Sequence, residues 1–143
     1  MGGMLAIGLA MATQAPAAEA PQRLGQCMAA KTTGEDRLLV ARWMLAGMAS
    51  APQMADIVTV TPGKKDGIDR NMAALFTRLL VRDCPDQSRA VFKLKTGEAF
   101  QVAGESLGRV AMEELMTNPR ANAALIAYVN YLKEDEFKAV TAP

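Results

Sequence analysis

The sequence of 143 residues contains no histidine, and this absence excludes many kinds of site. Without imidazole the chain cannot build a Ser-His-Asp or Cys-His catalytic arrangement, a histidine metal site or a histidine-ligated haem. Its two cysteines are too few for a four-sulfur zinc or iron–sulfur site within one chain. We therefore expect no cofactor, no resident metal ion and no catalytic residue of these classes.

Aromatic residues and an excess of one charge are also lacking. Aromatics make up 5% of the chain, and 16 basic side chains stand against 15 acidic ones. Nucleic-acid binding uses a basic face, and single-strand binding also uses stacked aromatic rings. We therefore expect no nucleic-acid partner. Half of the residues are hydrophobic and 22% are charged, which is the balance of a globular domain.

Residues 1–17 have the pattern of a secretory signal peptide. The apolar run MLAIGLAMA at 4–12 is much shorter than the roughly 20 residues that span a bilayer. Ala15 and Ala17 fit the small-residue cleavage rule, which starts the mature chain near Ala18. No Lys or Arg precedes the run, a departure that a translation start further upstream would explain. The alternative interpretation is a buried N-terminal helix.

This signal predicts a periplasmic or secreted protein with no stable membrane insertion after cleavage. Cysteines of small exported domains form disulfides in the oxidising compartment, so Cys27 and Cys84 are expected to form a disulfide. On the loop-entropy estimate such a bridge stabilises the fold by about 4 kcal/mol. The alternative is two free buried thiols in a cytosolic protein.

Proline stops and Thr or Asn caps divide the remaining chain into expected helices. We place them at 22–30, 34–49, 62–83, 85–93, 97–116 and 119–132, with a short helical turn followed by extended chain at 53–60. Thr33 is the expected N-cap of the second helix, with Asp36 three residues later. The charged tail at 134–143 is expected to fray, and the alternative is that Phe137 and Val140 dock on the body. The sequence therefore predicts an all-α fold, an irregular bundle of five or six helices with one disulfide, in a single domain over residues 21–140.

Apolar residues recur at helical spacing in three of these helices. The second helix carries a wide apolar band that includes Trp43, which we expect in the core. The predicted core faces of the third and fifth helices contain Ile68, Met72, Leu75, Phe76, Leu79 and Leu80, and Phe100, Ala103, Leu107, Val110, Ala111 and Leu115. Gly104 and Gly108 lie four apart, which indicates either close helix contact or a weak helix.

Two groups of side chains are candidates for chemistry. Met44 and Met48, and likewise Met112 and Met116, lie four apart on a helix, where thioethers can hold Cu(I) or simply fill core gaps. The core interpretation is favoured. Arg42 and its neighbour Trp43 are candidates for a ligand or partner site. Arg42 lies in the apolar band, where it can bind an anionic ligand, pair with a carboxylate, or extend into water.

Residues 27–54 carry a wider pattern: Cys27, then Thr-Thr-x-x-Asp-Arg at 32–37, then Trp43, apolar residues and Pro52. It continues through Thr-Val-Thr-Pro at 59–62, the leucine-rich third helix, Cys84 and a Gly-x-x-Ala-x-x-x-Leu stretch at 108–115. This chain resembles a group of small secreted helical proteins of Gram-negative bacteria. Members often carry a histidine where this chain has Ala51. The resemblance implies export, a helical fold and the cysteine pair, and it implies no activity.

Three functions are left open by these observations. The favoured hypothesis is a non-enzymatic exported protein that binds a partner protein. The second is a carrier of a small apolar ligand between helices, which requires a pocket of roughly 300 Å³. The third is an enzyme built on Arg42 and a carboxylate from another helix.

Overall fold

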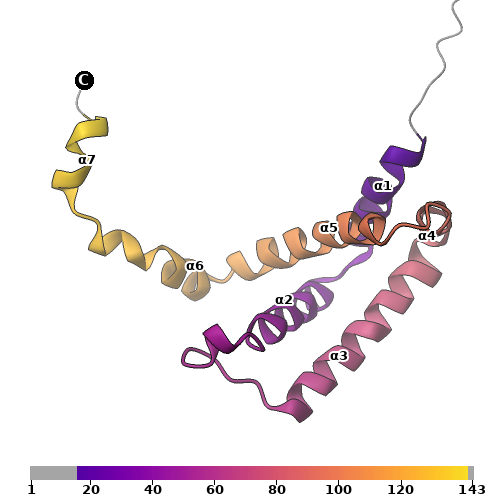
Figure 1. Ribbon diagram of the computed structural model, residues 1–143, viewed down its shortest axis with the longest axis horizontal. Helices are drawn as coiled ribbons and strands as arrows, with labels where there is room; N and C mark the ends of the chain where they lie inside the picture. The colour runs from indigo at the N-terminus through magenta and orange to yellow at the C-terminus, as the bar shows by residue number, and fades with distance from the viewer. Residues whose placement is uncertain (1–15, 142–143) are drawn as a thin grey trace, which may run out of the picture.

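The computed structural model describes residues 16–141 and, within this range, side chains from Glu19 onward. Its elements are α1 (Pro16–Lys31), α2 (Gly34–Met48), η1 (Pro52–Met54), α3 (Pro62–Thr77), η2 (Arg78–Asp83), α4 (Pro85–Phe92), α5 (Gly97–Met116), α6 (Pro119–Ile126), η3 (Ala127–Tyr131) and α7 (Glu134–Thr141) (Figure 1). Residues 16–141 contain no strand, so the predicted all-α fold is confirmed. No helix in this range is long and apolar enough to cross a membrane.

Helices α1 to α5 form the body of the protein, and α1 packs most closely against α5. The large side chains that are almost completely buried come from α1, α2, η2, α4 with its N-cap, and α5: Leu24, Met28, Val40, Leu79, Cys84, Val91 and Leu107. The predicted core faces are confirmed in α3, where Ile68, Met72 and Leu75 are buried, and in α5, where Ala103 and Leu107 are.

A glycine on α1 permits its close approach to α5. A Cβ atom on Gly25 would lie 2.9 Å from Cβ of Ser106 and 3.1 Å from the carbonyl oxygen of Ala103, so any other residue must push the helices apart. Of the two interpretations of Gly104, close helix contact does not hold, because a Cβ there would meet no atom within 4 Å. At Gly108 a Cβ would touch only the Met44 side chain, at 3.7 Å.

The first helix is longer than predicted. We expected it to begin after Pro21, but the helix runs from Pro16 through Pro21, and Ala20 is buried in the core. Residues 1–15 of the predicted signal lie outside the described residues. The predicted cleavage after Ala17 falls in the first turn of α1, so the cut would leave Ala20 and every later buried residue of the described side chains with the body.

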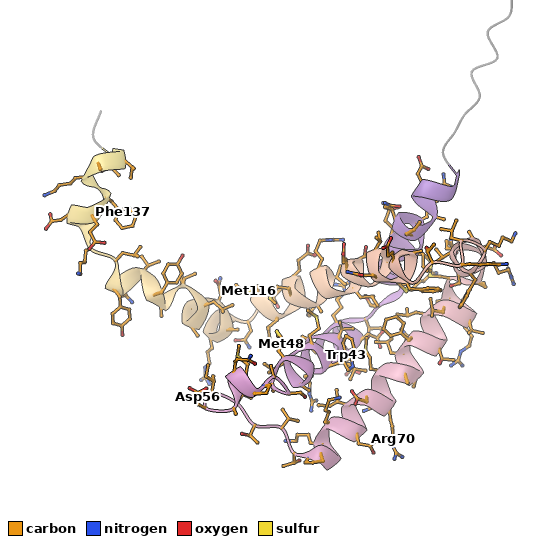
Figure 2. The ribbon with its side chains drawn as sticks, viewed as in Figure 1. Trp43, Met48, Asp56, Arg70, Met116 and Phe137 are labelled. Atoms are coloured by element: carbon orange, nitrogen blue, oxygen red, sulfur yellow. A yellow bond between two sulfur atoms is a disulfide. The ribbon has the colours of Figure 1, made fainter. Side chains whose placement is uncertain are left out.

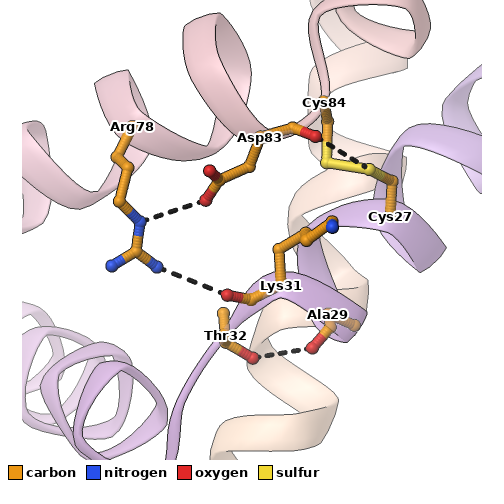
Figure 3. The surroundings of a disulfide bond; sticks show 7 residues. All are labelled: Cys27, Ala29, Lys31, Thr32, Arg78, Asp83 and Cys84. Atoms are coloured by element: carbon orange, nitrogen blue, oxygen red, sulfur yellow. Dashed lines mark hydrogen bonds and ion pairs between the residues drawn. A yellow bond between two sulfur atoms is a disulfide. The ribbon is translucent and has the colours of Figure 1, made fainter.

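The predicted third helix ends in a wider turn. Residues 78–83 form the π-helical segment η2, in which the Cys84 N–H donates to the carbonyl of Leu79, five residues back, at 2.8 Å. Leu79 and Cys84 both become fully buried. The segment brings Cys84 against α1, and the predicted Cys27–Cys84 disulfide is confirmed, with Cα atoms 6.1 Å apart (Figure 3).

The second helix differs most from its predicted packing. The capping box is confirmed: Thr33 Oγ1 accepts from the Asp36 N–H at 3.2 Å, and Asp36 Oδ2 accepts from the Thr33 N–H at 2.8 Å. Only Val40 and Ala46 of α2 are buried, however. The prediction that Trp43 lies in the core was wrong, since 40% of its surface is exposed. Helix α2 packs against α3 and α5 on two sides, which leaves part of its apolar surface open.

The C-terminal segment leads away from the body. We call residues 119–141, which comprise α6, η3 and α7, the C-terminal arm (Figure 1). The expected single helix to residue 132 changes to a 3-10 helix after Ile126, and the tail expected to fray contains α7. The arm packs only around its junction with α5, and its large apolar side chains are exposed: Leu125, Ile126, Tyr128, Val129, Tyr131, Leu132, Phe137 and Val140.

Candidate functional site

A polar network holds the start of α2 against η2. Arg78 Nη2 lies 2.7 Å from Asp36 Oδ2, and Arg78 Nε donates to Asp83 Oδ2 at 3.1 Å. The wide turn of η2 explains the second bond, because it brings residues five apart onto one side of the helix. Arg78 also donates to the carbonyl of Lys31 at the end of α1 (Figure 3). One guanidinium therefore joins three elements beside the disulfide.

This network fixes the charge state of its members. Burial alone would raise the pKa of Asp36, but hydrogen bonds from Arg78 and Thr33 lower the pKa below its ordinary value. The pKa of Arg78 is raised, chiefly by its hydrogen bond to Asp36. The residues are thus held as an ion pair, and their contacts are all structural.

The Thr-Thr-x-x-Asp-Arg pattern is explained by the same junction. Thr33 and Asp36 form the cap, while the Arg37 Nε donates to Thr32 Oγ1 at 3.1 Å and its Nη1 lies 3.5 Å from Glu114 Oε2 on α5. These residues hold α2 in place against α5. The pattern that carries the resemblance therefore builds the scaffold.

An apolar groove with a volume of about 330 Å³ lies beside this scaffold, between α2 and α5. Its lining consists of Leu38, Ala41, Arg42, Met44, Leu45, Met48, Met112 and Leu115. On α2 the positions 38, 41, 45 and 48 follow one stripe at helical spacing, and α5 supplies the opposite wall. Leu45 and Met48 remain 52% and 56% exposed, so the groove opens to solvent.

Arg42 is the one charged side chain among the groove-lining residues. No carboxylate within the described chain forms an ion pair with it, and the lining contains no acidic residue. The Arg–carboxylate pair that an enzyme at this position requires is therefore not formed in the groove. Arg42 instead leaves one positive charge on an apolar surface.

Trp43 does not belong to the groove. It follows Asp36, which pairs with Arg78 of η2, by seven residues, so both lie on one side of α2. Figure 2 shows Trp43 between α2 and α3. Neighbouring residues on a helix point in different directions, and the structure separates Arg42 from Trp43 for this reason. Of the two candidate ligand or partner residues, Arg42 therefore lines the groove and Trp43 does not.

Three of the four methionines in the two predicted pairs meet in the α2–α5 groove. Met44, Met48 and Met112 line one groove, and Met44 packs at Gly108. Met116 is not among the lining residues. Within residues 16–141, no group of three His, Cys, Asp or Glu side chains is placed to hold a metal ion. Three flexible thioethers therefore give the groove a soft, adaptable wall.

A second hollow, of about 700 Å³, lies between α1 and α4 but offers less to a ligand. Two of its three charged lining residues, Arg23 and Asp86, already have ion-pair partners on their own helices, and the third, Lys31, is the last residue of α1. Arg23 lies 2.8 Å from Glu19, and Asp86 pairs with Arg89. The α2–α5 groove, with its unpaired Arg42 and apolar walls, is the better candidate site.

Two adjacent carboxylates on α5 likewise have partners. Glu113 pairs with Arg109 at 2.7 Å, and Glu114 faces Arg37. Sequence reasoning missed the groove itself, because its two walls come from helices about 70 residues apart. The sequence feature that could have indicated the groove is the wide apolar band of α2.

Comparison with known proteins adds no assignment. No protein-family model matches the chain, and no curated protein or solved structure matches it either. The groove and its surroundings therefore carry the functional argument.

Proposed function

We propose that this chain is an exported, non-enzymatic protein that binds a partner protein through the α2–α5 groove. The observation that carries the proposal is the groove itself, an open apolar surface lined by three methionines and a single unpaired arginine. Exposed apolar patches of this kind mark interaction sites. The polar network and the disulfide hold its walls in position.

The dimensions of the groove suit an amphipathic helix. Its α2 wall runs from Leu38 to Met48, which is about 15 Å or nearly three helical turns. Amphipathic helices dock into such grooves through apolar residues three and four apart, and methionine adapts to their shape. Arg42 would add a contact with an acidic residue of the partner.

A capture experiment tests this proposal. Wild-type protein, a Met48→Lys variant and a Val81→Lys variant are tagged and used to capture proteins from a periplasmic extract. Met48 and Val81 are both exposed apolar residues, but Val81 lies on η2 outside the groove. We expect at least one protein, of any identity, that wild type and Val81→Lys retain and Met48→Lys loses. Failure to find any groove-dependent partner refutes the proposal.

A small apolar ligand is the second candidate, favoured by the groove volume of about 330 Å³. That volume falls within the range of ligand pockets, roughly 300–1,000 Å³. Titration with a fluorescent naphthylamine probe distinguishes this function. A carrier would show saturable binding at one site that Met48→Lys weakens and Val81→Lys preserves, whereas a protein-binding groove would show no saturable site.

Export is supported by the disulfide and by the signal pattern of residues 1–17. The chain is expressed in a Gram-negative host, and its periplasmic fraction is analysed by N-terminal sequencing. We expect a mature protein that starts near Ala18 and contains no free thiol. Full-length protein confined to the cytoplasm would contradict export.

A further inference from the structure

We infer that the partner of the α2–α5 groove is a second copy of this chain, which inserts its C-terminal arm. The inference rests on the proposed function, because it names the occupant of the same groove. Two copies would exchange arms reciprocally, so each groove would hold the arm of the other copy.

The arm is an apolar surface without a partner in its own chain. Leu125, Ile126, Val129 and Leu132 recur at intervals of one, three and three, and all are exposed. Water contact of so many large apolar groups is unfavourable, and a monomer rarely exposes them together. The arm therefore needs a cover, and the groove of the same chain needs an occupant.

The groove of its own chain is out of reach for this arm. The Asn118 side chain accepts hydrogen bonds from the Arg120 N–H at 3.0 Å and the Ala121 N–H at 3.2 Å, and Pro119 occupies the first helical position. This cap fixes α6 in a direction that leads away from the body (Figure 1). Phe137 consequently lies far from Met48 (Figure 2).

Size and charge both fit a second copy. Helix α6 has eight residues and η3 has five, which together give a rod of roughly 20 Å beside a groove wall of about 15 Å. In helix α7, Asp135 pairs with Lys138 at 2.7 Å and Glu136 lies 3.6 Å from Lys133. Glu134 is the acidic residue of the arm without an ion pair in the described chain, and it can meet the unpaired Arg42 of the other copy.

Reciprocal exchange also supplies enough surface for a stable dimer. A standard interface buries about 800 Å² on each partner. Each copy would contribute one arm with eight exposed large apolar side chains and one groove with Leu38, Leu45, Met48 and Met112 exposed. Two identical contacts related by a twofold axis close the assembly, so no unpaired arm or groove remains.

The test is the association state of the purified, oxidised full-length chain, measured by sedimentation equilibrium. We expect a dimer in wild type and in the control Val81→Lys. Met48→Lys places a charge in the groove and Ile126→Lys places one on the arm, and both residues are 56% exposed in the monomer, so the fold is retained. Because each charge occurs twice in the dimer, we expect the dissociation constant to rise at least about 100-fold in either variant. Circular dichroism confirms that the variants are folded.

Mixing the two variants gives the decisive arm of the experiment. A Met48→Lys chain retains an intact arm and an Ile126→Lys chain retains an intact groove, so the mixture should form heterodimers that neither variant forms alone. A wild-type chain that stays monomeric up to about 1 mM overturns the inference. So does a dimer that both variants preserve, or a mixture that forms no heterodimer. If the chain is monomeric but still captures another protein through Met48, the proposed function stands and only this inference fails.

Discussion

Removing the disulfide should weaken the fold without abolishing it. Cys27 and Cys84 are 57 residues apart, and a loop of this length costs the unfolded chain an entropy equivalent to about 4 kcal/mol at 25 °C. Small domains have total stabilities of about 5–15 kcal/mol, so the loss is a large fraction. Helix α1 keeps Leu24 and Met28 fully buried against α5 and its neighbours, each worth about 1.5–3 kcal/mol, which should keep it docked.

Urea unfolding followed by far-ultraviolet circular dichroism measures this loss. Wild type is compared with the double variant Cys27→Ala/Cys84→Ala and with wild type under a reductant. Reduction keeps both sulfur atoms in place. The difference in the free energy of unfolding between reduced wild type and the double variant therefore measures the cost of the cavity left at the fully buried Cys84. We expect reduction alone to lower the free energy of unfolding by about 3–4 kcal/mol. A loss under about 1 kcal/mol would refute the loop argument, because an unconstrained unfolded chain would then gain almost no entropy.

Three other substitutions, two of them with a comparison variant, test the packing and the polar network by the same unfolding assay. Gly25→Ala should destabilise the fold by about 1–3 kcal/mol, because the added Cβ would overlap α5. Gly104 faces open space, so Gly104→Ala should stabilise the fold by up to about 1 kcal/mol. Equal effects of the two substitutions would contradict the contact assigned to Gly25. Asp36→Asn should destabilise by about 1–3 kcal/mol. Because the pKa of Asp36 is lowered in the folded protein, the stability that Asp36 contributes is complete above the ordinary carboxyl pKa and disappears as pH falls through the lower folded pKa. The Asp36→Asn variant should lack this loss of stability in acid. The control Asp66→Asn, at an exposed ion pair, should retain it. Ser88→Ala should be neutral or stabilising by up to about 1 kcal/mol, because the buried Ser88 hydroxyl has no hydrogen-bond partner; a clear loss of stability would show that it is satisfied.

Local signals explain why most helices were predictable. Proline at the first helical position marks α3, α4 and α6, and the Thr33 capping box marks α2. These signals act within one turn, so they can be identified without knowledge of the fold. The disulfide was also predictable, because the chain has only two cysteines.

Features that depend on tertiary contact were not predictable. The apolar band of α2 has no local feature that separates its buried Val40 from its exposed Leu45. Which side is covered depends on where α3 and α5 lie, and this is set by the Arg78 network and the bridge. Gly25 resembled any helical glycine, while the more regular pair Gly104 and Gly108 attracted attention without making the close contact.

The candidate site was likewise predictable only where local sequence determined it. Arg42 was identified correctly as unusual in its apolar surroundings, and it lines the groove. Its neighbour Trp43 was assigned to the same site by sequence proximity, although the helical geometry directs it toward α3. The exposed arm was missed because the apolar spacing of Leu125 and Val129 is equally typical of a buried helix.

Methyl NMR of the methionines tests most directly whether the groove binds a protein segment. Spectra of the full-length chain are recorded from dilute to concentrated solution and compared with those of Ile126→Lys. We predict that the Met48 and Met112 methyl signals shift with concentration in wild type but not in the variant, while those of the buried Met28 and Met72 stay in place. Self-association that leaves the Met48 and Met112 signals unchanged would contradict the assignment of the groove as the binding site.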